Sequence, residues 1–304
     1  MASSDVVEIE GIVPVLPTPF LADGSVDEQS LRNVVEFCVA ERAAAVCLPA
    51  YAGEFYKLTE AERLRVVQVA AEQARGRIPV LGQANHVSAS AALELARAME
   101  DAGADLISLA APRVFGLSEE DLLRYFGAVC RGLKTGLLIQ DFNPGGSTVG
   151  AAFAARLRQQ HANFRYLKLE DPLMAPRIRA IREATDDRIG VLEGWGGMFM
   201  LELIPCGICG VMPGVPLLRV LHDTYWKRKR GEDRAALDAF QSVLPFIVFT
   251  LQHMEVFLHV EKRLLRRMGL LRSDHVREAT VQLDPDTSAY ADWLIDGLLP
   301  RLQP

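Results

Sequence analysis

Short apolar stretches alternate with longer amphipathic stretches eight times before residue 232, and this alternation limits the possible folds more than any other feature. The apolar stretches are continuous and rich in branched residues, as in strands that helices cover on both faces. The predicted strands are 12–17, 45–50, 78–83, 106–111, 136–141, 166–169, 189–194 and 208–213. Strands that alternate with helices predict a parallel sheet.

Helix start signals support this division of the chain. Residues that suit the N-cap position stand where four of the predicted helices begin: Asp27, Thr59, Ser88 and Ser118. Two of them are followed three residues later by an acidic residue, which predicts a capping box at each of these two helix starts.

Eight parallel strands form either an open doubly wound sheet or a closed barrel. The first strand ends in Pro17-Thr18-Pro19-Phe20 instead of a Gly-x-Gly-x-x-Gly turn, and the strands are evenly spaced. Both features favour a closed (β/α)8 TIM barrel over residues 1–232. After residue 232 the strands stop, and helices near 233–254, 256–270 and 287–302 predict a C-terminal helical extension, 233–304, packed on the barrel. A doubly wound binding protein is the alternative.

Composition excludes several classes of partner. The net charge is -6, and the clearest basic run, at 227–230, is too short to form a nucleic-acid surface. No signal peptide and no apolar run of membrane-spanning length is present, so we expect a soluble cytoplasmic protein without nucleic-acid or membrane partners. Cys206 and Cys209 form a lone Cys-x-x-Cys, but no second pair and no nearby histidine completes a four-ligand zinc site, so we expect neither a metal nor a cofactor.

Lys168 is the one lysine inside a predicted strand, close to its carboxyl end. Reactive groups of barrel enzymes lie on the loops that follow the strands. Burying a charged lysine in an apolar strand is costly, which favours the neutral amine that attacks a carbonyl group. The alternative is a structural ion pair between Lys168 and Glu54 or Glu170.

Two loops provide candidate binding groups near this lysine. After the second strand, a turn of small residues leaves the N–H groups of Tyr51 and Ala52 available for a carboxylate. After the fifth strand, the segment 139–148 is polar and rich in glycine. Each segment is equally compatible with a simple turn.

Several motifs spread over nearly the whole chain resemble one known family. They are GIVPVLPTPF at 11–20, AGEF at 52–55, LT-x-x-ER at 58–63, AGAD at 102–105, LK at 167–168 and GICGVMP at 207–213. They are similar to those of the dihydrodipicolinate synthase and N-acetylneuraminate lyase family of class I aldolases. The resemblance implies the barrel fold, a dimer or tetramer, and a Schiff base between Lys168 and pyruvate or another small 2-oxo acid.

The chain also departs from the family pattern. Ala50-Tyr51-Ala52-Gly53-Glu54 replaces Gly-Thr-Thr-Gly-Glu, and Gln140-Asp141 stands where the family commonly has a catalytic tyrosine. Arg113-Val114 replaces the tyrosine that a neighbouring subunit often supplies. Gly145-Gly146-Ser147 replaces an arginine that clamps a dicarboxylic aldehyde, which argues against the condensation of lysine biosynthesis. A lyase, aldolase or dehydratase with another substrate is implied, and a drifted member that binds a 2-oxo acid or carboxylate without turnover is the alternative.

Roles for the individual residues follow from these positions. Tyr51 is the first candidate for the missing acid–base group, followed by Asp141 and Glu170, and Gln140 occupies the place of the tyrosine. Each has a structural alternative: a pocket wall for Tyr51, a turn or cap for Asp141, and the ion partner of Lys168 for Glu170. The residues expected to bind substrate are Ala52, Gly53, Glu54, Arg113, Glu170, Trp195 and Gly210.

Overall fold

Eight parallel strands form the centre of the computed structural model, which describes residues 7–113, 115–142 and 149–302. The strands are β1 (Gly11–Ile12), β2 (Val46–Leu48), β3 (Val80–Gln83), β4 (Leu106–Ala110), β5 (Gly136–Asp141), β6 (Phe164–Leu169), β7 (Gly190–Glu193) and β8 (Gly210–Val211). All eight lie within or overlap the predicted strands, so the prediction is confirmed. The observed strands β1 and β8 are the shortest.

The sheet closes on itself. Neighbouring strands pair in the order β1-β8-β7-β6-β5-β4-β3-β2, and every pair is parallel. The segment after β1 completes the circle, because Val15 bridges Cys47 on one side and Gly214 on the other. The N–H of Ala44 also donates to the carbonyl of Ile12 at 2.8 Å. The predicted TIM barrel is confirmed, and the open doubly wound sheet is excluded.

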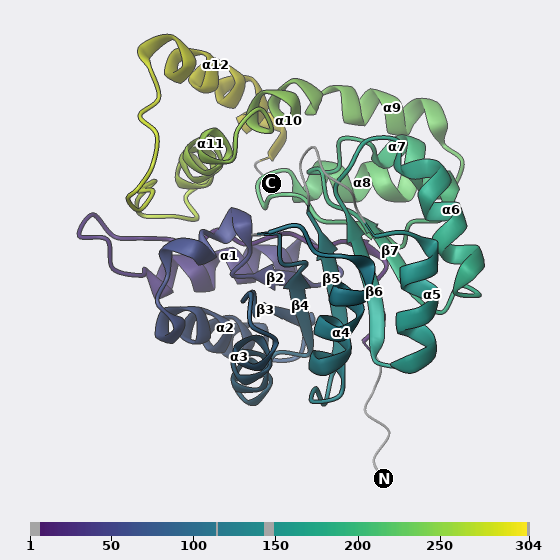
Figure 1. The fold of residues 1–304 in the computed structure, drawn as a ribbon. Coiled ribbons are helices and arrows are strands. Elements are labelled where there is room, and N and C mark those ends of the chain that lie inside the picture. The colour runs from purple at the N-terminus through teal and green to yellow at the C-terminus, as the bar shows by residue number, and fades with distance from the viewer. Residues whose placement is uncertain (1–6, 114, 143–148, 303–304) are drawn as a thin grey trace.

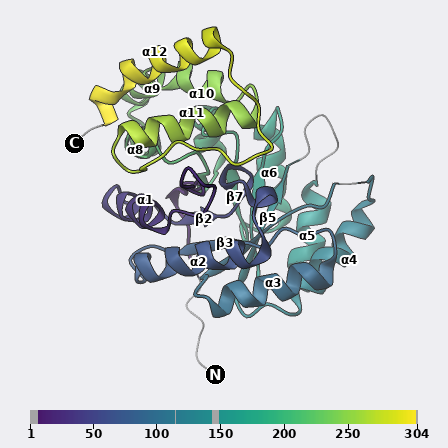
Figure 2. The same ribbon diagram turned by 90° about the vertical axis from the view of Figure 1, so that its left-hand side faces the viewer.

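Helices surround the strands in Figures 1 and 2. Those of the barrel are α1 (Glu28–Ala40), α2 (Glu60–Ala74), α3 (Ala89–Asp101), α4 (Glu119–Cys130), α5 (Ala151–Gln160), α6 (Met174–Ala184), α7 (Met200–Leu203) and α8 (Leu218–Lys229). The predicted N-caps of α1 to α4 all accept backbone N–H groups, and both capping boxes form. Local side-chain chemistry therefore sets where these helices begin.

The barrel interior is apolar except at its mouth. Leu81, Leu106, Leu138, Tyr166 and Leu192 form part of one buried cluster inside the strands. The hydroxyl of Tyr166 donates to the carbonyl of residue 7 at 2.8 Å and accepts the N–H of residue 9 at 2.9 Å, so the amino-terminal segment covers this end of the barrel. Side chains two residues apart on a strand share a face, which places Lys168 above Tyr166 and towards the other end.

The C-terminal region is helical, as predicted, but its first predicted helix is divided in two. It contains α9 (Asp233–Gln241), α10 (Leu244–Thr250), α11 (Met254–Arg267) and α12 (Pro285–Leu302). Figures 1 and 2 place α10 to α12 at the end of the barrel away from the N-terminus. Phe240, Val260 and Leu298 belong to the same apolar cluster as the barrel helices. The domain boundary at residue 232 stays a prediction.

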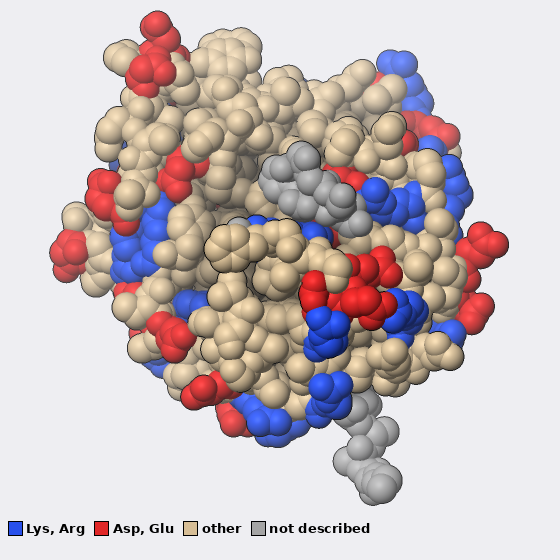
Figure 3. Space-filling model, in the orientation of Figure 1, with Lys and Arg blue, Asp and Glu red and all other residues tan. Residues whose placement is uncertain are grey.

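The basic run at the end of α8 is neutralised by acidic neighbours. Its four members form ion pairs, in order, with Asp223, Asp233, Glu10 and Glu232. Lys and Arg are interspersed with Asp and Glu on the face drawn in Figure 3. Among the described residues, no helix has both the length and the apolar composition needed to cross a membrane.

Candidate active site

A pocket opens where the strands end and the C-terminal helices cover the barrel. Its volume is about 80 Å³, enough for several water-sized groups and therefore for a small organic acid. The lining comes from strand ends and from the α10–α11 turn: Val15, Ala50, Tyr51, Ala52, Gln140, Lys168, Glu170, Gly194, Gly196, Met212, Pro213, Gly214, Thr250, Leu251, His253, Met254 and Phe257. Lys168, Glu170, Gln140, Tyr51 and Ala52, which were predicted from the sequence, thus meet in one cavity.

Lys168 faces this pocket and is 5% exposed. Its Nζ lies 2.9 Å from Oε1 of Glu170. The sequence left two readings of Lys168 open, a reactive amine and the ion partner of Glu170, and the structure shows the pairing together with access to the pocket. Glu170 is also the nearest acceptor for the proton that must leave before Lys168 can act as a nucleophile.

A chain of amide side chains holds Glu170 in place. Gln140 donates from Nε2 to Oε2 of Glu170 at 2.7 Å, and Gln83 donates from Nε2 to Oε1 of Gln140 at 2.7 Å. Each carboxylate oxygen of Glu170 therefore has a different partner. Gln83 was not predicted from the sequence to be functional, although it is the last residue of β3 and its side chain reaches Gln140. Burial raises the pKa of the neighbouring thiol, Cys47, to about 12, so it stays protonated.

The loop after β7 packs directly on the reactive pair. A Cβ atom at Gly194 would lie 2.5 Å from Cε of Lys168 and 2.3 Å from Cγ of Glu170. Glu193 is fully buried and accepts the N–H of Gly197 at 2.8 Å, which fixes the path of this loop. Burial raises the pKa of Glu193 to about 7. A glycine at position 194 is therefore required for the observed positions of the Lys168 and Glu170 side chains.

The turn after β2 supplies both N–H donors and a phenol. Residues Tyr51–Gly53 form a short 3-10 helix, and among the described residues the N–H groups of Tyr51 and Ala52 have no acceptor. The turn is held by Thr18, whose hydroxyl donates to the carbonyl of Gly53 at 2.6 Å. Burial, aided by the charge of Glu170, raises the pKa of Tyr51. Its phenol is therefore a proton donor at neutral pH.

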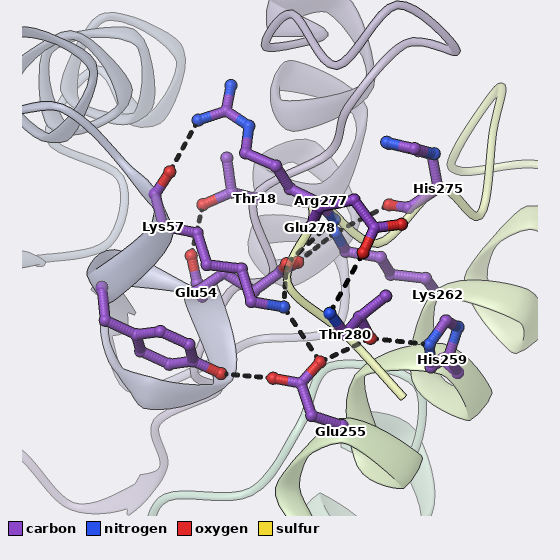
Figure 4. Close-up of polar contacts among 12 residues, drawn as sticks. Thr18, Glu54, Lys57, Glu255, His259, Lys262, His275, Arg277, Glu278 and Thr280 are labelled. Atoms are coloured by element: carbon purple, nitrogen blue, oxygen red, sulfur yellow. Dashed lines mark hydrogen bonds and ion pairs between the residues drawn. The ribbon is translucent and has the colours of Figure 1, made fainter. Parts of the chain in front are cut away.

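Glu54 is fully buried and does not line the pocket. It forms ion pairs with Lys262 of α11 and with Lys57, the latter at 3.2 Å, and accepts the N–H of Arg277 at 3.2 Å. Figure 4 shows these side chains converging from the β2 loop, α11 and the segment that follows α11. The structure thus places Glu54 in a clamp between the barrel and the C-terminal helices.

Asp141 and Arg113 form an ion pair beside the pocket, outside its lining. The other oxygen of Asp141 accepts the N–H of Val149 at 2.6 Å. Burial raises the pKa of Asp141, against the opposing effect of Arg113. The two side chains are therefore engaged with each other, and Asp141 is also engaged with the backbone.

Three further residues that were expected to bind substrate, Trp195, Gly210 and Gly53, also lie outside the lining. Trp195 is half-buried between Gly194 and Gly196, which do line the pocket. At Gly210 a Cβ atom would lie 2.3 Å from the carbonyl oxygen of Gly11, so close strand packing accounts for this glycine. At Gly53 a Cβ atom would lie 2.8 Å from the carbonyl oxygen of Leu16, so close packing also accounts for this glycine. Val114 and Gly145-Gly146-Ser147 lie outside the described residues.

No residue in or beside the α10–α11 turn was predicted from the sequence to be functional. Thr250, Leu251, His253, Met254 and Phe257 all line the pocket. No motif marks them, because they follow the last strand and reach the site only through tertiary packing. Within the described residues, no three His, Cys, Asp or Glu side chains lie close enough together to hold a metal ion.

Comparisons with known proteins agree over almost the entire length. The model of the dihydrodipicolinate synthetase family matches residues 8–292. L-2-keto-3-deoxyarabonate dehydratase of Azospirillum brasilense is 26% identical, with 95% of this chain and 94% of the relative covered. 4-Hydroxy-tetrahydrodipicolinate synthase of Methanopyrus kandleri is 27% identical over 78% of this chain and 80% of the relative. The crystal structure of dihydrodipicolinate synthase from Rhodopseudomonas palustris superimposes with a TM-score of 0.90 and 25% identity, covering 96% of this chain and 99% of that one.

Proposed function

The chain belongs to the dihydrodipicolinate synthetase family, whose members include Schiff-base lyases of 2-oxo acids, and we propose that it dehydrates a small 2-oxo-3-deoxy acid through an imine on Lys168. The observation that carries this proposal is the position of Lys168. Its amine faces a pocket of suitable size, 2.9 Å from a carboxylate that an amide holds in place.

Imine formation uses Lys168 and Glu170. Glu170 accepts a proton from the ammonium group, and the neutral amine attacks C2 of the substrate. The resulting carbinolamine loses its hydroxyl group as water, to which Glu170 returns the proton. The product is a protonated imine between Lys168 and C2, with one water released.

Dehydration then follows at C3 and C4. Glu170 removes a proton from C3, and the electron pair moves into the imine to give an enamine. When the pair returns, the C4–O bond breaks, and the departing hydroxyl takes a proton from the phenol of Tyr51 and leaves as water. The proton that Glu170 took from C3 then passes to the Tyr51 phenolate, directly or through the released water, which restores both groups. Hydrolysis of the conjugated imine frees the unsaturated 2-oxo acid and regenerates the amine.

The turn after β2 suits the carboxylate of the substrate. The N–H groups of Tyr51 and Ala52 have no acceptor among the described residues, and both residues line the pocket. Convergent backbone N–H groups bind anions without any charged side chain. The two missing threonine hydroxyls of the family motif are therefore not needed to hold this group.

Two observations favour dehydration over the condensation of lysine biosynthesis. Among the described residues that line the pocket there is no arginine, and therefore no clamp for a second carboxylate. The relative covered over 94% of its length is a 2-keto-3-deoxy acid dehydratase. A member that only binds a 2-oxo acid is the second candidate, favoured by Gln140, because an amide cannot transfer protons.

We expect the enzyme to act in the cytoplasm as an assembly of two or four chains. Phe115 and Leu173 support an oligomer, because these apolar side chains are 80% and 87% exposed in the single chain. Sedimentation equilibrium of the purified chain measures the assembly size, and a monomer at micromolar concentration would contradict this expectation.

Borohydride trapping tests the chemistry directly. The protein is incubated with pyruvate, 2-oxobutyrate or a five-carbon 2-oxo-3-deoxy sugar acid and reduced, and its peptides are analysed by mass spectrometry. We expect the adduct on the Lys168 peptide and none in Lys168→Ala. Turnover without pyruvate release identifies dehydration, whereas pyruvate release identifies aldol cleavage. Trapping without any turnover supports the binding protein, and the lack of an adduct with every acid would refute the imine.

A further inference from the structure

We propose that His253 is a specificity-determining residue that binds a hydroxyl group on the substrate tail, which extends the proposed function by naming the substrate class. The residue lies in the α10–α11 turn, whose side chains form one part of the pocket wall. This turn belongs to the C-terminal helices, so the barrel alone does not complete the pocket.

The polar side chains of the lining leave few groups for the tail. Within the described lining they are Tyr51, Gln140, Lys168, Glu170, Thr250 and His253. The proposed reaction uses the first four, either directly or to position Glu170. The hydroxyl of Thr250 is already bonded to two helix carbonyls, at 2.9 and 3.1 Å. His253 is therefore the remaining side chain with an uncommitted polar group.

The hydrogen bonding of His253 shows which group it offers. Its Nδ1 accepts the N–H of Glu255 at 3.1 Å and caps the first turn of α11. In a neutral imidazole, a ring nitrogen that accepts a hydrogen bond carries no proton, so the proton resides on Nε2. Among the described residues Nε2 has no partner. A single N–H donor suits an oxygen atom, such as that of a hydroxyl group.

The clamp around Glu54 fixes this donor relative to the carboxylate site. Glu255 accepts from Tyr56 at 2.8 Å. It also accepts from Lys57 at 2.9 Å and from Thr280 at 2.6 Å, as Figure 4 shows. Lys57 in turn pairs with Glu54, which directly follows the Tyr51–Gly53 turn. The start of α11 and the predicted carboxylate donors are thus tied to one network.

The proposed contacts describe the ligand by its chemistry. Two N–H groups hold the carboxylate, Lys168 holds C2, and His253 holds an oxygen further along the chain. The inferred substrate class is a 2-oxo-3-deoxy acid of about five carbons with a hydroxyl group beyond C4. A substrate that ends in an apolar group loses the contact with His253.

The test compares two substrates that differ in one oxygen atom. One is a 2-oxo-3-deoxy acid with hydroxyl groups on C4 and C5, and the other is 2-oxo-4-hydroxypentanoate, which lacks the C5 hydroxyl. We expect the wild-type protein to prefer the first in kcat/KM by about tenfold, as for one neutral hydrogen bond. In His253→Phe and His253→Asn this preference falls to about one.

Matched variants separate recognition from helix capping. Asn is a good N-cap, so His253→Asn keeps the helix start but withdraws the imidazole. Ser88→Ala removes the N-cap of α3, which lies outside the pocket, and should leave the preference unchanged. Borohydride trapping of pyruvate should be equal in the wild type and in both His253 variants, because pyruvate has no tail.

Equal losses on both substrates, or slower trapping of pyruvate, would overturn the role of His253. Failure of the wild-type protein to form an adduct with any 2-oxo acid would instead refute the proposed function, so the two failures are distinguishable. If a C5 carboxylate is preferred to a C5 hydroxyl, the inferred substrate class is wrong.

Discussion

Two lysines of this chain are buried, and each faces a carboxylate, but their surroundings differ. Lys168 lies at a strand end, pairs with Glu170 and faces the pocket. Lys262 lies in the middle of α11, is 0% exposed, pairs with Glu54 and also donates to the carbonyl of His275 at 3.0 Å. Burial lowers the pKa of Lys262, although Glu54 opposes this change.

The difference shows what distinguishes a reactive amine from a structural one. A lysine with a perturbed pKa is a general indicator of a functional site, and Lys262 satisfies that criterion. Phe20 covers its ammonium group, with the ring centroid 4.4 Å from Nζ, and Lys262 does not line the pocket. Burial and ion pairing are common to both lysines, whereas only Lys168 lines the pocket. Lys168 is therefore the candidate nucleophile.

The largest expected effects come from exchanging each lysine for methionine. Lys168→Met should abolish turnover, a loss of about 10⁴-fold or more, because no other amine reaches the substrate. Lys262→Met should lower the free energy of unfolding by roughly 3 kcal/mol, since it leaves Glu54 buried with only Lys57 as its ion partner.

Urea unfolding and borohydride trapping, measured on both variants, check this pair of predictions. Folded Lys262→Met should still form the adduct, whereas Lys168→Met should remain folded and form none. A Lys262→Met protein that is folded but cannot be trapped would contradict the division between the two lysines.

Gly194→Ala should have the next largest effect. The new methyl group would displace the flexible ends of Lys168 and Glu170, and a shift of about 1 Å costs on the order of 100-fold in kcat/KM. Stability should change little, because side chains rather than backbone must move. Gly297→Ala, in α12 with no atom within 4 Å of the new Cβ, is the control. Equal activity in both variants would show that the observed position of Lys168 is not required.

The last prediction concerns the pH dependence that arises from Glu261, the neighbour of Lys262. Burial raises its pKa from 4.5 to about 8, and its only bonded oxygen accepts the N–H of Val215 at 2.7 Å. The folded state binds the Glu261 proton more tightly than the unfolded state does, so protonation of Glu261 contributes to the free energy of unfolding. This contribution is complete below pH 4.5 and is lost as the pH rises towards 8. The slope is at most about 1.4 kcal/mol per pH unit.

Glu261→Gln replaces the titratable carboxyl group with an amide and should flatten the pH dependence of the free energy of unfolding between pH 5 and 8. Thermal unfolding at a series of pH values measures the difference between the two proteins. Parallel curves for wild type and variant would show that Glu261 does not change its protonation on unfolding.

Much of the fold was predictable because local signals and strand burial agree. The eight apolar stretches, the four N-caps and both capping boxes were all expected from the sequence and are observed. The position of Lys168 inside the barrel follows from the two-residue period that it shares with Tyr166. The break between α9 and α10 was missed, although Pro245 stands at the start of α10.

The site was less predictable because it combines distant segments. Lys262 was assigned only to a helix, yet Leu258, Glu261, Lys262 and Leu265 follow the i, i+3, i+4, i+7 pattern of a buried face. That pattern indicates a buried charge, but it does not identify Glu54 as the partner. His253 carries no signal, because its place in the pocket depends on how α11 packs on the barrel.

The amino-terminal segment bonded to Tyr166 has a consequence for the order of events. With that end of the barrel covered, a reactant must arrive, and a product must depart, through the same opening beside the C-terminal helices. A departing product and an arriving reactant then exclude each other. Inhibition by the product should accordingly be competitive, and turnover should slow in viscous solvents if this exchange is the slowest step.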